Sequence, residues 1–178
     1  MITRNGALRA AAACLIAAGS LGIVQTTAAA AGHAAAPTWL SYNAKSKTAK
    51  LTVIAGYGGG GFNFNGYQNG KLTVTVPLNT KVVVTYSNAS SIAHSVEFVP
   101  FSKSAPVTAP SPAFKGAASA SYMAGVTSSA KPQTFTFIAN KAGKFLMICA
   151  VPGHAVAGMW DNFVVDAKAK AASLAVSK

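Results

Sequence analysis

The chain has 178 residues, enough for one domain with a hydrophobic core, and 51% of them are hydrophobic. Fifteen lysines and arginines oppose three carboxylates, giving a formal net charge of +12 that favours anionic partners. We nevertheless do not expect nucleic acid as a partner. Arginine makes the commonest base contact, and no arginine follows Arg9.

Residues 1–36 are predicted to be an export signal with a flexible linker. A basic start, an apolar run from Ala10 to Val24 and an alanine-rich stretch follow one another in the order typical of such signals. The run of about 15 residues is short for a membrane span, which needs roughly 20, so an N-terminal membrane anchor is the alternative. We expect an exported, periplasmic or extracytoplasmic protein, with membrane association through the N-terminus if the segment is retained.

Removal of this region leaves Cys149 as the single cysteine, because Cys14 lies inside the apolar run. A disulfide within the mature chain is then excluded, although export would permit one. A lone thiol outside the cytoplasm is open to oxidation, and a bound metal would protect it.

The region 37–167 is predicted to be one all-β domain. Seven short segments are rich in Val, Ile, Thr and Phe, and several of them alternate with a period of two. They span 50–56, 71–77, 81–87, 94–100, 133–139, 144–150 and 160–166. Seven to eight such strands indicate an antiparallel β-sandwich with Greek-key connections.

Three segments interrupt this pattern. The stretch "GYGGGG" at 56–61 lacks the lysine and Ser/Thr of a phosphate loop, so we interpret it as a flexible turn. Residues 100–132 form a long loop insertion, and loops of this length usually carry function or local structure, here one or two short helical turns. Residues 168–178 are expected to be a flexible C-terminal tail.

The segment "CAVPGHAVAGMW" contains Cys149, His154 and Met159. Each residue alone would more often be core than ligand. Together a thiolate, an imidazole and a thioether form a donor set typical of copper, whereas zinc sites rarely use methionine. A type 1 copper site needs a second histidine, and His94, just before a predicted strand, is the only histidine left outside 1–36. We therefore predict His94, Cys149, His154 and Met159 as metal ligands.

These motifs resemble the sulfocyanins and, more distantly, the rusticyanins, both blue copper proteins of the cupredoxin family. The similar parts are "FNFNGYQNG" at 62–70, the His94 segment and the Cys-x4-His-x4-Met spacing, within a resemblance from Trp39 to Asp166. The resemblance implies a cupredoxin-like Greek-key sandwich or barrel. It also implies one type 1 copper ion, cycling between Cu(I) and Cu(II), at the four predicted ligands.

The same resemblance implies a single-electron carrier. Its partners would be redox proteins such as a cytochrome or a haem–copper terminal oxidase in a respiratory chain, and we expect the chain to be a monomer. Many cupredoxins have asparagine after the first histidine, whereas Ser95 here is similar to rusticyanin. Weaker hydrogen bonding to the thiolate predicts a high reduction potential. The scarcity of carboxylates predicts tolerance of an acidic environment, and lysines around His154 could steer an acidic partner.

Two other functions could use the same residues. An enzyme using Cys149 as nucleophile, with His154 or His94 as base, needs an exposed, activated thiol and an oxyanion site. Nothing in the sequence supplies these, so we do not expect an enzyme. An exported copper chaperone or storage protein could use the same donors. Such proteins favour exposed Met- or His-rich sites, and this chain has four methionines.

Overall fold

The computed structural model describes residues 38–177, and their regular structure is nine β-strands and one short 3-10 turn, Tyr57–Gly59. The all-β prediction is confirmed. The strands are β1 Leu40–Asn43, β2 Thr48–Ala55, β3 Leu72–Pro77, β4 Thr80–Asn88, β5 Glu97–Pro100, β6 Gln133–Ala139, β7 Gly143–Ile148, β8 Trp160–Asp166 and β9 Ser173–Val176. The expected export signal at 1–36 lies outside the described residues. Within them, no helix has the length and apolarity to span a bilayer.

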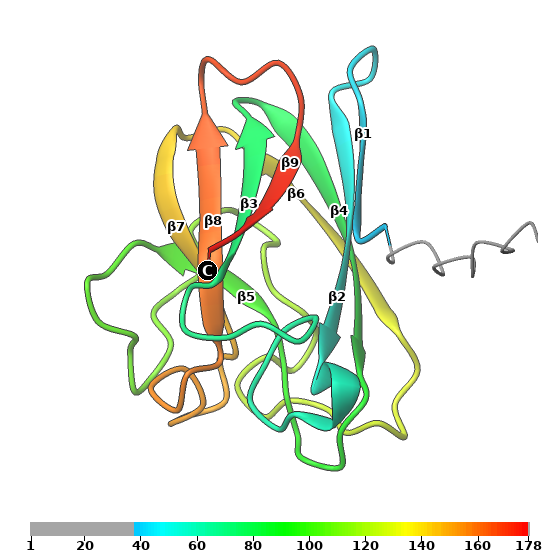
Figure 1. Ribbon diagram of the computed structural model, residues 1–178, viewed down its shortest axis with the longest axis vertical. Helices are drawn as coiled ribbons and strands as arrows, with labels where there is room; N and C mark the ends of the chain where they lie inside the picture. Colours follow the sequence, from blue (N-terminus) through cyan, green and yellow to red (C-terminus); the bar gives the residue numbers. More distant parts are fainter. Residues whose placement is uncertain (1–37, 178) are drawn as a thin grey trace, which may run out of the picture. The chain divides into compact units, whose positions relative to one another are not determined.

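The strands form two sheets packed face to face (Figure 1). One has the order β1-β2-β4-β6 and the other the order β5-β7-β8-β3-β9. The expectation of an antiparallel sandwich needs correction, because β2 pairs with β4, and β3 with β8, in parallel. Alternating side chains predict that a strand has one buried face, but they do not reveal the direction of its neighbour.

Alternation explains why these segments form the two inner faces. In β4, every second residue from Thr80 to Asn88 is buried, which places the valines and Tyr86 in the core. The centre of the core is aromatic: the ring of Phe98 lies 4.9 Å from that of Phe137 and 4.8 Å from that of Phe163. Aromatic pairs of this geometry add about 0.5–1.5 kcal/mol beyond the burial of area. This packed core provides a firm base for the loops at either end.

Two edge strands were not predicted. β1 is a four-residue strand on the edge beside β2, and its composition is polar. β9 lies in the region 168–178 that we expected to be a flexible tail, and there it pairs antiparallel with β3 from Leu72↔Val176 to Thr75↔Ser173. That expectation is corrected. The lysine- and alanine-rich sequence of this segment does not predict a strand. It becomes one because its backbone forms hydrogen bonds with the free edge of β3.

The long insertion 100–132 folds back over the edge of the second sheet. The N–H of Phe98 donates to Ala117 O at 2.9 Å, and the N–H of Ala113 donates to Phe98 O at 2.8 Å. The expected helical turn is reduced to a hydrogen-bonded turn in which Gly125 N–H donates to Ser121 O at 2.8 Å. The insertion thus covers an otherwise open strand edge, as sheet proteins generally require.

Candidate metal centre

Three of the predicted ligands meet at one end of the sandwich. The loops that join β7 to β8 and β4 to β5 lie at this end, at the bottom of Figure 1. Cys149 directly follows β7, His154 lies in the turn before β8, and His94 lies between β4 and β5. Their candidate ligand atoms all lie within 4.8 Å of one another. The fold therefore brings together residues that are 55 and 60 positions apart.

The loop from Cys149 to Met159 is held by its own backbone hydrogen bonds. The N–H of Cys149 donates to Met159 O at 3.1 Å, and the N–H of Met159 donates to His154 O at 3.1 Å. Gly158 has a φ of +103°, and a Cβ added there would lie 2.9 Å from the side chain of Asn69. Only glycine fits both this conformation and this close approach.

The backbone of His94 is held in place by the insertion 100–132. It exchanges two backbone hydrogen bonds with Val126, at 3.0 and 2.8 Å. The side-chain amide of Asn88 donates to Val126 O and to Ile92 O, each at 2.6 Å, and so joins the end of β4 to both loops. A Cβ on Gly125 would lie 2.9 Å from the N and O atoms of His94, so this close contact also requires glycine. The backbone of His94 is thus fixed before any ligand binds.

The three donor atoms fit one metal ion. Nδ1 of His94 lies 3.1 Å from Nδ1 of His154, and Sγ of Cys149 lies 3.4 Å from the nitrogen of His154 and 3.8 Å from that of His94. The point equidistant from these atoms is about 2 Å from each, close to usual metal–nitrogen and metal–sulfur bond lengths of about 2.0 and 2.3 Å. A trigonal site of two histidines and one cysteine therefore fits without rearrangement.

Met159 lies in the same loop and is fully buried. Its backbone is hydrogen-bonded to both Cys149 and His154. His94 and Cys149 are also buried, whereas His154 is only partly so. The imidazole of His154 is therefore partly exposed to solvent, whereas His94, Cys149 and Met159 are enclosed by the protein.

Ser95 contacts the cysteine sulfur directly. Its N–H donates to Sγ at 3.4 Å, and its hydroxyl lies 3.7 Å from Sγ while accepting the N–H of Ala150 at 3.0 Å. Burial raises the pKa of the Cys149 thiol, and the contacts with Ser95 partly oppose this. A buried thiol of raised pKa is a poor nucleophile unless a metal deprotonates it.

Both histidines favour the neutral form that metals bind. Burial lowers the pKa of His94 to about 4, with a further contribution from the nearby charge of His154. Burial also lowers the pKa of His154. The imidazoles therefore remain available as ligands well into the acid range.

Phe62, which belongs to the "FNFNG" motif, covers the site. Its ring centroid lies 4.9 Å from that of His154 and 5.8 Å from that of His94, in both cases edge to face. The contact with both histidines has no signal in the sequence, because Phe62 is far from either of them along the chain.

The asparagines of the same motif fasten the loop to β2. The side chain of Asn65 accepts the N–H of Ile54 at 2.7 Å and donates to Thr52 O at 2.9 Å. Asn63 donates to Gly60 O at 2.9 Å and accepts the N–H of Gly66 at 3.0 Å. These bonds fix the position of Phe62, so the motif supports the site without supplying a ligand.

Three of the loops at this end carry no charge, whereas the insertion 100–132 contains Lys103, Lys115 and Lys131. Residues 56–70, 89–96 and 149–159 contain neither lysine nor carboxylate, although the described chain contains twelve lysines. These three loops therefore do not supply the lysines that were expected around His154. Exposed apolar side chains occur here instead, including Val156 and Ile92.

Comparison with known proteins agrees with this arrangement. The model of the Sulfocyanin (SoxE) domain matches residues 34–175. A sulfocyanin of Sulfolobus acidocaldarius is 27% identical over 136 residues, which cover 70% of this chain and 67% of the relative. Crystal structures of two rusticyanin variants are each 22% identical, with TM-scores of 0.52 and 0.50. Both alignments cover 67% of this chain, and they cover 78% and 77% of those structures respectively. These two likenesses support the fold.

Proposed function

This chain belongs to the sulfocyanin family, and from that premise we propose that it is a mononuclear type 1 blue copper protein that carries single electrons. The observation that carries the proposal is the triangle of His94 Nδ1, His154 Nδ1 and Cys149 Sγ around a single point. Such a trigonal His₂Cys group is the arrangement typical of blue copper electron-transfer sites.

His94, Cys149 and His154 would hold the ion, with Met159 as a fourth and weaker ligand. The donor set favours copper over zinc, because a thioether has little use at a zinc site. When bound, the ion supplies one-electron chemistry between Cu(I) and Cu(II). The residues hold their positions through the hydrogen bonds of both loops, so little rearrangement should accompany a change of oxidation state.

The electron would leave through the partly exposed edge of His154. The surface around it is neutral and apolar, with Val156 51% exposed and Ile92 41% exposed. Transient redox interfaces are small, and a neutral apolar patch suits brief docking. We propose a redox protein such as a cytochrome or a haem–copper terminal oxidase as the partner.

The proposed location of the protein is outside the cytoplasm. We propose that it is exported by residues 1–36 or held at the membrane through them, as a monomer in an acidic environment. A high reduction potential is supported by the buried, apolar surroundings of the donor atoms.

The test is spectroscopic. Purified protein receives Cu(II), and its visible and paramagnetic-resonance spectra are recorded. We expect an intense thiolate-to-copper band with narrow hyperfine splitting, which Cys149→Ser abolishes. A colourless complex formed only with Cu(I) would instead support the chaperone or storage function. Thiol-dependent hydrolysis without metal would support the enzyme.

A second buried methionine, Met147, provides a matched control for the role of Met159. Met159→Leu should shift the visible spectrum and the potential, because it removes the thioether. Met147→Leu changes an equally buried methionine of β7 and should leave both unchanged. Equal spectra for the two variants would remove Met159 from the proposed ligand set.

A further inference from the structure

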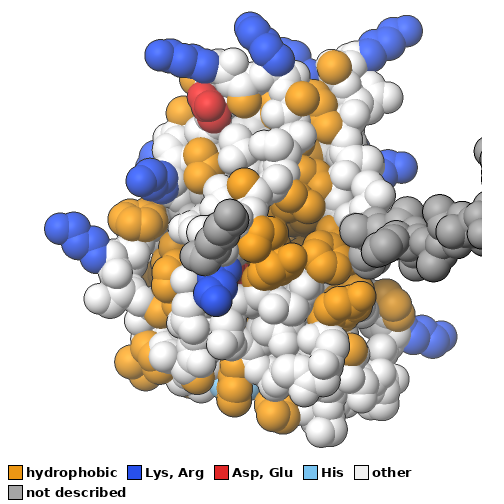
Figure 2. All heavy atoms as spheres, in the orientation of Figure 1, with side chains coloured by type: hydrophobic (Ala, Val, Ile, Leu, Met, Phe, Trp, Pro, Cys, Tyr) orange, Lys and Arg blue, Asp and Glu red, His pale blue; other side chains and the backbone are white. Residues whose placement is uncertain are grey.

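Seven exposed lysines gather at the end of the sandwich opposite His94, Cys149 and His154. They come from four separate connections: β1–β2, the start of β4, β6–β7 with the start of β7, and β8–β9. We call this surface the lysine end, and it comprises Lys45, Lys47, Lys81, Lys141, Lys144, Lys168 and Lys170. Figure 2 shows lysines along the top of the molecule, with hydrophobic side chains and histidine at the lower edge.

The four connections form one platform because backbone hydrogen bonds link them. The N–H of Lys81 donates to Lys47 O at 2.9 Å, which joins the start of β4 to the β1–β2 turn. The N–H of Asn79 donates to Ala139 O at 2.8 Å, and that of Leu78 donates to Asp166 O at 3.1 Å. The lysines are therefore presented by a fixed surface.

The charge at this end is almost entirely positive. Of the three carboxylates in the chain, Glu97 and Asp161 are fully buried, and only Asp166 lies at the lysine end. One oxygen of Asp166 already accepts the N–H of Lys168 at 2.7 Å. Seven lysines thus face one carboxylate, and this concentration is absent from the three loops that build the metal centre.

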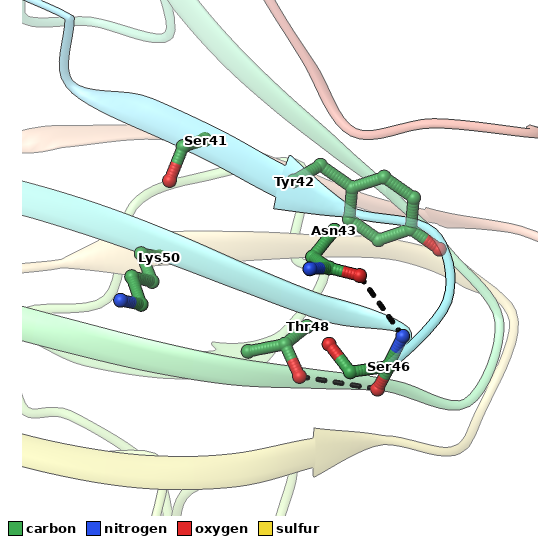
Figure 3. Close-up of a pocket in the computed structure, with 6 residues that line it drawn as sticks. All are labelled: Ser41, Tyr42, Asn43, Ser46, Thr48 and Lys50. Atoms are coloured by element: carbon green, nitrogen blue, oxygen red, sulfur yellow. Dashed lines mark hydrogen bonds between the residues drawn. The ribbon is translucent and has the colours of Figure 1, made fainter.

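The shape of the lysine end favours a broad anionic surface over a small ligand. The recess beside it is shallow and is lined by Ser41, Tyr42, Asn43, Ser46, Thr48 and Lys50 (Figure 3). Hydrogen bonds of 3.0 Å from Ser46 N–H to Asn43 and of 3.1 Å from the Thr48 hydroxyl to Ser46 O occupy much of its polar lining. Lysine is a point charge without the fork that makes arginine selective for paired oxygens, and no arginine lies among the described residues.

We propose that the lysine end docks the protein onto an anionic phospholipid surface. Several lysines held at one end provide the additive, weakly directional attraction that anionic head groups exert on basic segments. Carboxylates of an acidic partner protein would lose their charge as the pH falls toward their ordinary pKa values, near 4, whereas phosphodiester head groups keep theirs. Docking in this orientation leaves the His154 end facing away from the lipid, and it does not depend on which metal that end binds.

The experiment compares two variants of equal net charge in the full chain. One replaces Lys45, Lys141, Lys168 and Lys170 with glutamine, and the control replaces Lys71, Lys103, Lys115 and Lys131. Sedimentation is measured with vesicles of phosphatidylcholine, with and without one part in three of phosphatidylglycerol. The vesicles without anionic lipid measure any contribution of residues 1–37, which all the proteins share.

Each lysine near an anionic surface contributes about fivefold to partitioning. The first variant should therefore lose about 25-fold of its binding to anionic vesicles if two of its four lysines touch the surface, and about 600-fold if all four do. The control should lose less than about threefold, because its lysines lie away from the contact surface. Acetylation by a water-soluble reagent should be suppressed at Lys45, Lys141, Lys168 and Lys170 when vesicles are present.

Three results would overturn the proposal. The first is equal binding of the native chain to vesicles with and without phosphatidylglycerol. The second is an equal loss in both variants, which would show that net charge alone matters. The third is binding to polyglutamate without binding to vesicles, which would identify an acidic protein as the partner.

Discussion

At the scale of single residues, the site depends on side chains that touch the ligands as much as on the ligands themselves. Ser95 contacts the sulfur of Cys149 through both its N–H and its hydroxyl. Phe62 presents its ring to His94 and His154 together. One residue acts on the thiolate and the other keeps water from the imidazoles, so both should affect the energy of the bound ion.

Ser95→Asn should lower the reduction potential. The larger amide can bond to both loops and hold them more firmly, which leaves the site less freedom to relax in the reduced state. One net hydrogen bond is worth about 1 kcal/mol, which is roughly 40 mV for a one-electron couple. Voltammetry of the copper-loaded variant measures the shift, and an unchanged potential would remove Ser95 as a determinant of it.

Phe62→Ala should destabilise the fold by about 2 kcal/mol, less than for a fully buried phenylalanine because Phe62 is half-buried. Copper should also dissociate faster, since water reaches both imidazoles. Phe101→Ala is the matched control, because Phe101 is 48% exposed and should change stability little. Denaturant unfolding and transfer of copper to a chelator report the two effects, and equal behaviour of the variants would contradict the role of Phe62.

At the scale of elements, the strands are held by backbone hydrogen bonds to their neighbours, whereas the loops are held by hydrogen bonds from side chains. The loop that carries Phe62 contains many glycines, which bring little packing of their own. Asn65 replaces that packing by accepting the N–H of Ile54 and donating to Thr52 O, and so extends the hydrogen bonding of β2 into the loop. The positive φ of 54° at Asn65 is one that asparagine tolerates better than most residues.

Asn65→Gly should cost about 1–3 kcal/mol of stability, because it keeps the backbone conformation but leaves the partners in β2 unpaired. Asn69→Gly is the control: Asn69 has a similar φ of 57° and is exposed. Its N–H bond to Gly158 O belongs to the backbone and survives the change. Thermal unfolding of both variants decides the matter, and a loss no larger than the control's would show that the side chain of Asn65 is dispensable.

At the scale of the whole molecule, two of the three carboxylates, Glu97 and Asp161, are placed where ionisation is unfavourable. Glu97 is fully buried, and neither of its oxygens has a hydrogen-bond partner. Burial raises its pKa from 4.5 to about 7. The folded chain therefore holds this proton more strongly than the unfolded chain does, which favours folding in acid.

Stability should therefore fall as the pH rises. Below pH 4.5 Glu97 is protonated in both states, so its contribution is complete. Between 4.5 and about 7 only the unfolded chain releases the proton, and about 3 kcal/mol is lost across this interval. Glu97→Gln should make the curve of unfolding free energy against pH less steep, and the buried Asp161, whose pKa burial also raises to about 7, should account for the slope that remains. Asp166→Asn, a change at a partly exposed carboxylate, should leave the slope as it is. A native protein most stable at neutral pH would refute this account.

The molecule is also divided by charge along its length. The loops that carry Phe62, His94 and Cys149 are neutral and apolar, whereas seven of the twelve described lysines lie at the opposite end. Net charge, which the sequence reports, does not reveal this separation. It depends on which turns share an end of the sandwich, and strand direction decides that.

The sequence alone was sufficient for the β class, for seven of the nine strands and for the choice of candidate ligands. Alternating Val, Ile, Thr and Phe report a strand locally, and the spacing of Cys149, His154 and Met159 lies within one segment. The tertiary structure decided what depends on distant partners: the parallel pairs β2–β4 and β3–β8, and strand β9 on the edge of β3. It also decided the contact of Phe62 with both imidazoles. These features arise from hydrogen bonds and packing between segments far apart in the chain, and no local pattern of residues encodes such pairings.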